Sequence, residues 1–89
     1  MKSRTTRRYR DLLAALPASV RRQARSAYRQ FVRNPSHPGL RFKQVCPSPP
    51  TYSARVGSGH RAVGGLEGDT VVWYWIGSHA DYDKLLDQL

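Results

Sequence analysis

The 89-residue sequence has a single cysteine, only one acidic residue among its first 45 positions, and no long apolar run. Because Cys46 is alone, an intrachain disulfide, a zinc knuckle and a CxxC redox pair are all excluded. No stretch of about 20 apolar residues exists to cross a bilayer, and no apolar segment typical of a signal peptide follows the basic start of the chain. We therefore expect a cytoplasmic protein that folds as one domain over residues 1–89.

The charge is distributed unevenly along the chain. Residues 1–45 carry twelve lysines and arginines against Asp11 alone, a net charge of +11, whereas residues 46–89 carry a net charge of −2. Most of the basic residues are arginines, whose guanidinium groups bind phosphate and carboxylate oxygens in pairs. The composition favours an anionic partner, either a nucleic acid or an acidic protein, with high solubility alone as the alternative.

Two helices are predicted in the basic half. Apolar residues recur at helical spacing before Pro17, behind Thr5 and Thr6 as candidate caps, and a second helix runs from Pro17 to Asn34. Its face opposite the apolar stripe carries no acidic residue. Four arginines on that face form what is referred to below as the arginine ridge: Arg22, Arg25, Arg29 and Arg33. The ridge predicts a surface that binds nucleic acid or an acidic partner, and a plain solvated face is the alternative.

The second half of the chain predicts an antiparallel sheet built from consecutive hairpins. In its first strand, Arg41 and Lys43 are expected on one face and Leu40 and Phe42 on the other. The last strand is apolar on both faces, with Trp73 and Trp75 as core residues, and is expected to be central. Residues 2–6 are a candidate for a further edge strand. The four strand-like runs are residues 40–45, 51–57, 60–66 and 70–76.

A terminal helix is predicted after the last strand. Ser78 and Asp81 have the spacing of a capping box, and the apolar stripe that follows docks the helix onto the sheet: Tyr82, Leu85, Leu86 and Leu89. The fold class is therefore α+β, with an N-terminal helical hairpin packed on a four-stranded antiparallel sheet and a C-terminal helix.

Two segments of this sequence resemble the RelE/ParE toxin superfamily. Tyr52-Ser-Ala-Arg55-Val-Gly, followed by His60-Arg61-Ala-Val63, is similar to the family's Y-x-x-R-[VI]-G … [YW]-R pair of strands. The tail Trp75-Ile-Gly-Ser-His79-Ala-Asp-Tyr82-Asp resembles the [IV]-G-[ST]-H-x-x-Y-[DE] ending of HigB-like members. The helix junction at residues 16–24, the turn at 34–43 and the order of elements agree. The resemblance spans nearly the whole chain and implies a RelE/ParE-like fold and a bacterial toxin of a type II toxin–antitoxin pair.

The resemblance implies alternative activities. RelE-type members cut mRNA in the ribosomal A site and repress translation, whereas ParE-type members of similar fold poison DNA gyrase. The leading hypothesis is a metal-independent, ribosome-dependent mRNA endoribonuclease (an mRNA interferase). The alternatives are a gyrase inhibitor and a degenerate member that acts as a basic nucleic-acid-binding or protein-binding module. The RelE prototype has two arginines after its tail histidine, where this chain has Ala80 and Asp81. The family also implies a cognate antitoxin, whose acidic segment covers the basic groove, together with ribosome and mRNA as partners.

RNA cleavage without a metal uses the 2′-hydroxyl of the substrate as nucleophile, so the protein supplies a base, an acid and cations for the phosphorane. Arg61 matches the family arginine that contacts the scissile phosphate; its alternative is a structural role, for example pairing with Asp81 or Asp83. His79 matches the tail histidine to which acid–base catalysis is assigned in several ribosome-dependent family members. Its expected place in the first helical turn favours a neutral imidazole. Its alternative is to fix the start of the helix through hydrogen bonds.

Further candidates surround these two residues. Tyr82 is expected on the same helical face as His79. Its alternative roles are to stack on a nucleobase, to donate a proton, or to pack in the core. His60 takes the aromatic position of the [YW]-R pair, with an exposed hairpin residue as the alternative. No HxxxH or carboxylate cluster suggests a metal, and no cofactor is expected. The residues expected to help bind phosphate are Arg41, Lys43 and Arg55.

Overall fold

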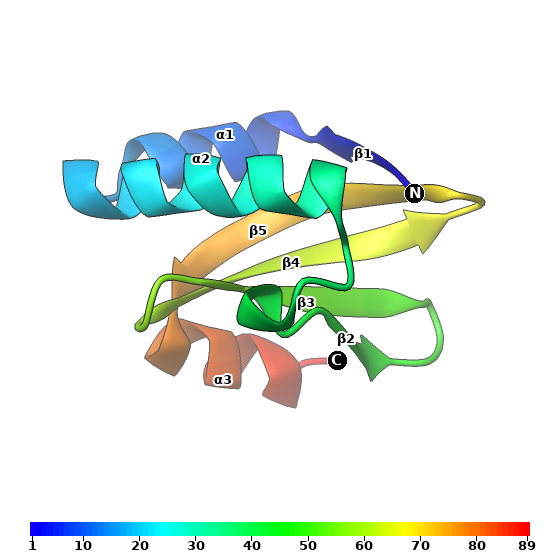
Figure 1. Ribbon diagram of the computed structural model, residues 1–89. Coiled ribbons are helices and arrows are strands. Elements are labelled where there is room, and N and C mark those ends of the chain that lie inside the picture. Colours follow the sequence, from blue (N-terminus) through cyan, green and yellow to red (C-terminus); the bar gives the residue numbers. More distant parts are fainter.

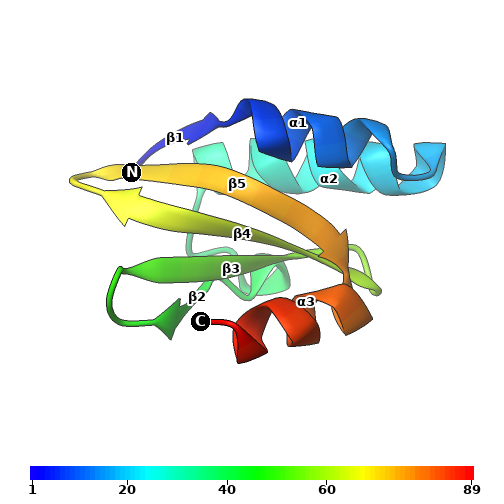
Figure 2. The same ribbon diagram turned by 180° about the vertical axis from the view of Figure 1, so that it is seen from behind.

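Five strands form one mixed sheet, with two helices on one face and a third helix on the other, in the computed structural model, which describes residues 1–89 (Figures 1 and 2). The spatial strand order is β1-β5-β4-β3-β2. In chain order the elements are β1 (Lys2–Thr5), α1 (Arg7–Ala14), α2 (Ala18–Arg33), the 3₁₀ helix η1 (Pro38–Leu40), β2 (Lys43–Cys46), β3 (Thr51–Val56), β4 (His60–Glu67), β5 (Thr70–Ser78) and α3 (His79–Asp87).

The predicted helices are confirmed, except that Leu89, expected in the docking stripe of the last helix, lies beyond the end of α3 and is 50% exposed. The Thr6 hydroxyl accepts a hydrogen bond from the backbone N–H of Tyr9 at the start of α1, and the Ser78 hydroxyl accepts one from Asp81 at the start of α3. Pro17 and Asn34 cap the two ends of α2. None of these helices is long and apolar enough to span a membrane.

The fold class is confirmed, but the sheet has five strands and is mixed, not four-stranded and antiparallel. The candidate edge strand at the N-terminus is real, and it pairs with β5 in parallel. The backbone N–H of Lys2 donates to Asp69 O, and that of Thr6 donates to Trp73 O. Such parallel pairing needs a long crossover, which α1, α2 and the three remaining strands supply.

The strand predicted over residues 40–45 begins three residues later, at Lys43. The imidazole Nδ1 of His37 accepts a hydrogen bond from the Gly39 backbone N–H and caps the short helix η1, which includes Leu40. Arg41 follows with a φ of 45°, in the left-handed region. Arg41 therefore lies in a turn and does not share a strand face with Lys43, because local capping by His37 overrides the alternating pattern.

A β-bulge divides the two tryptophans of β5 between the two faces of the sheet. Val63 pairs with Trp75 and Gly64 with Trp73, so Tyr74 is an extra residue on β5. Trp73 is buried beneath α2 against Phe31, whereas Trp75 is buried on the α3 side with Val63 and Tyr82. Both are core residues, as predicted, and each faces a different layer.

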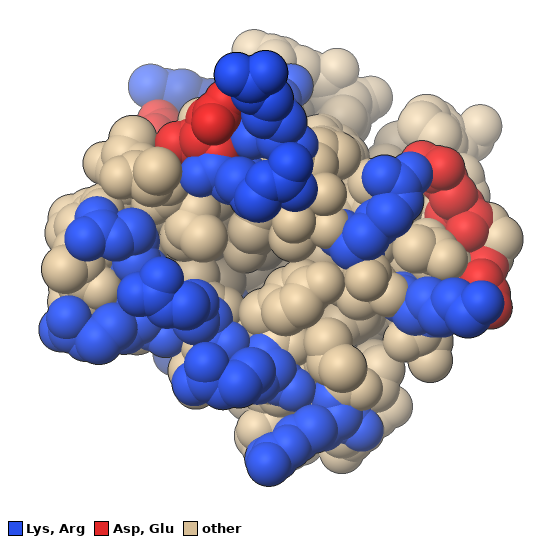
Figure 3. Space-filling model, turned by 90° about the horizontal axis from the view of Figure 1, so that it is seen from above, with Lys and Arg blue, Asp and Glu red and all other residues tan.

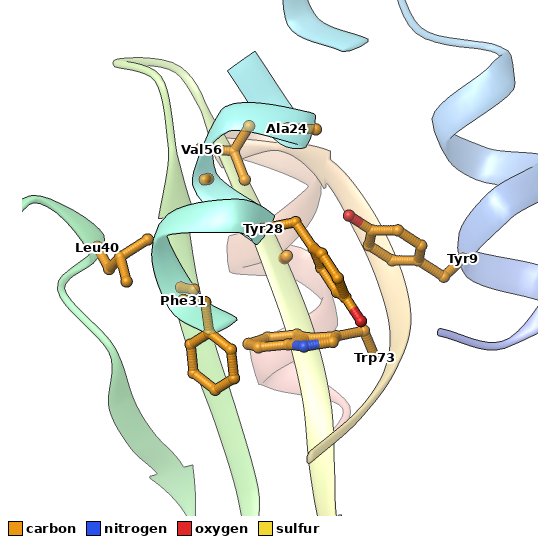
Figure 4. Close-up of a pocket in the computed structure, with 10 residues that line it drawn as sticks. Tyr9, Ala24, Tyr28, Phe31, Leu40, Val56 and Trp73 are labelled. Carbon is orange, nitrogen blue, oxygen red and sulfur yellow. The ribbon is translucent and has the colours of Figure 1, made fainter. Parts of the chain in front are cut away.

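The larger core layer lies between α1, α2 and the sheet. It contains a small cavity of about 20 Å³ whose ten lining residues are all hydrophobic, among them Tyr9, Tyr28 and Phe31 (Figure 4). Trp73 Nε1 donates to the Ser3 hydroxyl (2.9 Å), and that hydroxyl donates to the Tyr28 hydroxyl oxygen (3.2 Å). These two bonds tie β1 and α2 to β5, which was expected to be central but is second from the edge because β1 pairs outside it.

Candidate functional site

The α3 side of the sheet brings together three residues from different elements. Tyr82 of α3 is buried, and its hydroxyl donates a hydrogen bond to the Ser53 hydroxyl oxygen of β3 over 3.1 Å. The Arg61 guanidinium of β4 lies 5.6 Å from the centroid of the Tyr82 ring, the arrangement of a cation–π contact. Tyr82 is therefore a core residue that also supports Arg61, and its hydroxyl is already engaged.

Arg61 is held in an environment that leaves part of its hydrogen-bonding capacity unused. The side chain is half-buried, and its Nη1 atom is fully buried without a hydrogen-bond partner. Neither Asp81 nor Asp83 forms an ion pair with it, so the predicted structural alternative of such a pair is not found. A buried donor that lacks a partner costs free energy, so the position of Arg61 carries a cost that no contact within the chain offsets.

His79 is the first residue of α3 and faces solvent. Its side chain is 55% exposed, with Nε2 at 3.6 Å from Asp83 Oδ1 and the ring centroid 5.7 Å from that of Tyr82. Its backbone N–H donates to Gly59 O in the β3–β4 turn. The backbone of His79 thus helps to fix the helix start, as one alternative predicted, and the imidazole remains accessible beside the ring that supports Arg61.

Strand register places further basic side chains, some near this cluster and some away from it. Lys43 is directly opposite Ser53, so it lies on the α3 face. Arg55 is opposite Arg61, but its Nε donates to Gly57 O (2.8 Å), and the residue also lines a cleft beside α2. His60 lines a different groove, between α1 and α3, and Arg41 lies in the turn after η1. The structure thus groups Arg61, His79, Tyr82 and Lys43, and separates His60 and Arg41 from them.

The arginine ridge lies on the opposite side of the molecule, above the helical layer. All four of its residues are exposed, and none forms an ion pair. Seen over α1 and α2, basic side chains form a continuous band, while the few acidic side chains in view lie elsewhere beside other basic residues (Figure 3). Between α1 and α2 runs a groove whose floor includes Tyr9, Leu13 and Tyr28 and whose rim includes Arg10, Arg25 and Arg29.

Ser53 is the site residue that sequence reasoning missed. It is completely buried, yet it is polar and lies on β3 opposite Val63. The alternation of β3 placed it on the face of Arg55, and a buried hydroxyl needs a hydrogen-bonding partner. That partner, Tyr82, is 29 positions away in the sequence, so only the packing of α3 identifies it. No three His, Cys, Asp or Glu side chains gather where they could hold a metal ion.

Comparisons with known proteins agree with this architecture. A family model described as the ParE-like toxin domain matches residues 18–84, from the first residue of α2 into α3. No curated protein matches the chain.

Two solved structures share the fold. The RelBE2 toxin–antitoxin complex from Mycobacterium tuberculosis matches with a TM-score of 0.66 and 22% identity, over 88% of this chain and 96% of that chain. A copper-bound mutant toxin from Helicobacter pylori matches with a TM-score of 0.57 and 16% identity, over 91% of this chain and 97% of that chain. With the family model covering most of its length, the chain belongs to the ParE-like toxin domain family of the RelE/ParE toxin superfamily.

Proposed function

We propose that this toxin is a metal-independent, ribosome-dependent mRNA endoribonuclease that represses translation in the cytoplasm, with Arg61 and His79 at its centre. The observation that carries the proposal is the buried Nη1 of Arg61, which has no partner and is held beside the Tyr82 ring. The half-buried guanidinium has no carboxylate beside it, so an anionic group that binds its accessible part completes the site, and a phosphodiester is such a group.

The arrangement supports an internal transfer reaction of RNA. The neutral imidazole of His79 takes the proton of the 2′-hydroxyl, whose oxygen attacks the adjacent phosphorus while the bond to the 5′-oxygen breaks. The imidazolium then returns a proton, through water, to the leaving 5′-oxygen. Arg61 stabilises the charge on the phosphorane, with Lys43 on the same face of the sheet. Tyr82 and Ser53 position Arg61 and do not touch the substrate.

The test is induced expression with mapping of mRNA 5′ ends. We expect new codon-phased ends with the wild-type chain. Arg61→Ala is expected to lower cleavage by about 100-fold to 1,000-fold, as loss of one transition-state donor does, and His79→Ala by about 100-fold or more. Arg7→Ala is the matched control, because Arg7 is a highly exposed arginine that pairs only with Asp11. Full cleavage in both site variants contradicts the proposal.

A gyrase inhibitor is the second candidate, because the matching family model is ParE-like and Ala80 and Asp81 replace the arginine pair of the RelE prototype. This candidate predicts growth arrest without new mRNA ends and inhibition of DNA supercoiling by the purified chain. Cleavage that disappears with Arg61→Ala eliminates it.

We further propose that a cognate antitoxin binds the groove between α1 and α2. The RelBE2 relative of similar fold was crystallised as a toxin–antitoxin complex. The groove combines an apolar floor with an arginine rim, which suits an amphipathic acidic segment. Co-purification with the product of the neighbouring gene is expected to yield a complex, and Arg25→Glu combined with Arg29→Glu is expected to weaken it. A complex that tolerates both changes contradicts this binding surface.

A further inference from the structure

The ridge has a second flank, and its chemistry differs from that of the antitoxin groove. A cleft lies between α2, η1 and the β3–β4 turn, and only Ala27 and Leu40 of its nine lining residues are hydrophobic. Three of its polar residues, Gln23, Ser26 and Gln30, recur along one side of α2. The other side chains are His37, beside η1, and Arg55, at the end of β3. No carboxylate lines the cleft.

Two of these side chains are fixed with hydrogen-bonding atoms still unused. Arg55 donates through Nε to Gly57 O, which anchors the guanidinium and leaves its two terminal nitrogens free. The Nδ1 atom of His37 accepts from the Gly39 backbone N–H, so the neutral ring carries its proton on Nε2. Both groups therefore offer N–H donors at the cleft.

A glycine shapes the wall of the cleft. Gly57 has a φ of 58°, a left-handed conformation that other residues rarely adopt, and the Gln23 amide packs against it in the space that a side chain would occupy. The turn thus brings Gln23 and Arg55 close to the same backbone position from two different elements.

The ridge supplies charge at both ends of the polar stripe. Arg22 adjoins Gln23, and Arg33 lies one helical turn beyond Gln30. Along the helix axis the two arginines are separated by about 16 Å. Both are exposed and free of ion pairs, so this flank of α2 presents hydrogen-bonding groups between two unneutralised cations.

We propose that this cleft binds one nucleotide of a single-stranded RNA, with neighbouring phosphates on Arg22 and Arg33. Amide side chains have the paired donor and acceptor that base edges require, and arginines bind phosphates. The site opens toward α2, and its Arg55 lies directly across the β3–β4 ladder from Arg61, so it adjoins the proposed cleavage centre without including Arg61 or His79. It rests on the proposed RNA-cleaving function and adds to it an RNA-binding site outside the cleavage centre.

The chemistry of the cleft favours RNA over the other anionic ligands. An acidic amphipathic peptide needs an apolar floor, which the groove between α1 and α2 has and this cleft lacks. A free mononucleotide can engage only one of two arginines separated by about 16 Å. A strand of several nucleotides reaches both.

The test is fluorescence anisotropy of a labelled single-stranded RNA of about 12 nucleotides, a length within the usual span of such sites. The full-length chain carries Arg61→Ala, so the RNA stays intact. Gln30→Ala is expected to weaken binding about tenfold with an unchanged salt dependence, as loss of a base-edge contact does. Arg33→Ala is expected to weaken binding and to lower the slope of log affinity against log salt by about 0.7, the value for one phosphate contact.

Two controls are matched to these variants. Gln88→Ala removes an exposed glutamine at the end of α3, and Arg7→Ala removes an exposed arginine on α1. Both should bind the RNA like the parent chain. Equal weakening by Gln88→Ala and Gln30→Ala, or no effect of Gln30→Ala and Ser26→Ala, overturns the proposal.

Competition separates the alternative ligands. Displacement of the RNA by uridine monophosphate at a similar concentration would identify a free nucleotide as the ligand, and preferential binding of oligoglutamate would identify an acidic protein segment. Either result overturns the RNA assignment. The binding measurement involves no cleavage, so it is independent of the proposed activity. Absence of new mRNA ends in cells would refute the proposed function alone. An RNA affinity that is the same in the cleft variants and the parent chain would refute this inference alone.

Discussion

Ser53 and Tyr82 show how one buried pair connects stability with the proposed site. The Ser53 hydroxyl is completely buried, and the Tyr82 hydroxyl that donates to it belongs to the ring beneath Arg61. Removing one partner leaves a buried hydroxyl unsatisfied, whereas removing both leaves none. The pair therefore holds Arg61 in place indirectly, through the orientation of the aromatic ring.

We predict that Ser53→Ala lowers the free energy of unfolding by about 1–3 kcal/mol, the cost of an unsatisfied buried hydroxyl. Tyr82→Phe should cost about 1 kcal/mol, and the double variant should cost clearly less than the sum of the two. Urea denaturation of the four proteins measures this coupling. Strictly additive losses would show that the hydrogen bond does not contribute.

Tyr9 predicts a decrease in stability at alkaline pH. Burial, with a contribution from nearby Tyr28, raises the pKa of Tyr9 from 10.0 to about 12. Between these values the unfolded chain loses a proton that the folded chain keeps, so stability falls as the pH rises, by about 2.3 kcal/mol at pH 12. Tyr9→Phe should reduce this loss in denaturation curves at pH 9 to about 12. Tyr52→Phe, which changes a half-buried tyrosine stacked on Phe42, is the control that should retain it. Identical alkaline losses in both variants would contradict the assignment to Tyr9.

At the scale of the elements, the start of α3 is the place where local structure and the proposed chemistry depend on each other. The Ser78 hydroxyl accepts from the Asp81 backbone N–H, and the next residue, His79, begins the helix. We predict that Ser78→Ala lowers the free energy of unfolding by about 1 kcal/mol and loosens the first turn that carries the imidazole. Ser58→Ala, in the exposed β3–β4 turn, is the control. Thermal unfolding and mRNA cleavage, measured on the same variants, test both effects. A Ser78→Ala protein as stable as the Ser58→Ala control would contradict the role of the cap.

The sequence pattern predicts the elements whose signals are local and misses those that depend on distant partners. Helix bounds follow from Thr6, Pro17 and Ser78, because caps and breakers act within a few residues. The parallel pairing of β1 with β5 joins segments nearly 70 positions apart, and no local pattern specifies it. The β-bulge at Tyr74 also has no local sequence signal, because a bulge depends on the register with the partner strand.

The same division applies to the site. The resemblance identified Arg61 and His79 by motif, and the structure brings both near the Tyr82 ring. The structure also separates Arg41 and His60 from these residues. Arg41 lies in a left-handed turn, and His60 lines the groove between α1 and α3. The roles of the grouped residues stay predictions for the cleavage assay.

At the scale of the whole molecule, the uneven charge becomes a difference between two surfaces. Three of the five acidic residues in the second half lie near basic side chains: Asp69 beside Lys2, Glu67 beside Arg4 and Asp83 beside His79. The arginine ridge has no such partners, and α2 contains five arginines and no acid. Two opposed surfaces, one with a partly buried arginine and one with exposed arginines, fit a small protein that contacts one large polyanion on several sides.

Repulsion among the ridge arginines predicts an unusual response to salt. In the unfolded chain these charges are farther apart, so screening stabilises the folded state more than the unfolded state. We expect the free energy of unfolding to rise by on the order of 1 kcal/mol between low salt and several times the physiological ionic strength. Arg25→Gln combined with Arg29→Gln should raise stability at low salt and flatten the dependence, because two mutually repelling charges are gone. Arg7→Gln removes a residue paired with Asp11 and should leave the slope nearly unchanged. Denaturation across a sodium chloride series measures the slope of the free energy of unfolding against salt concentration. If the double variant and Arg7→Gln show the same slope, the ridge imposes no electrostatic cost on the fold. The argument that its charge is retained for an anionic partner then loses its energetic support.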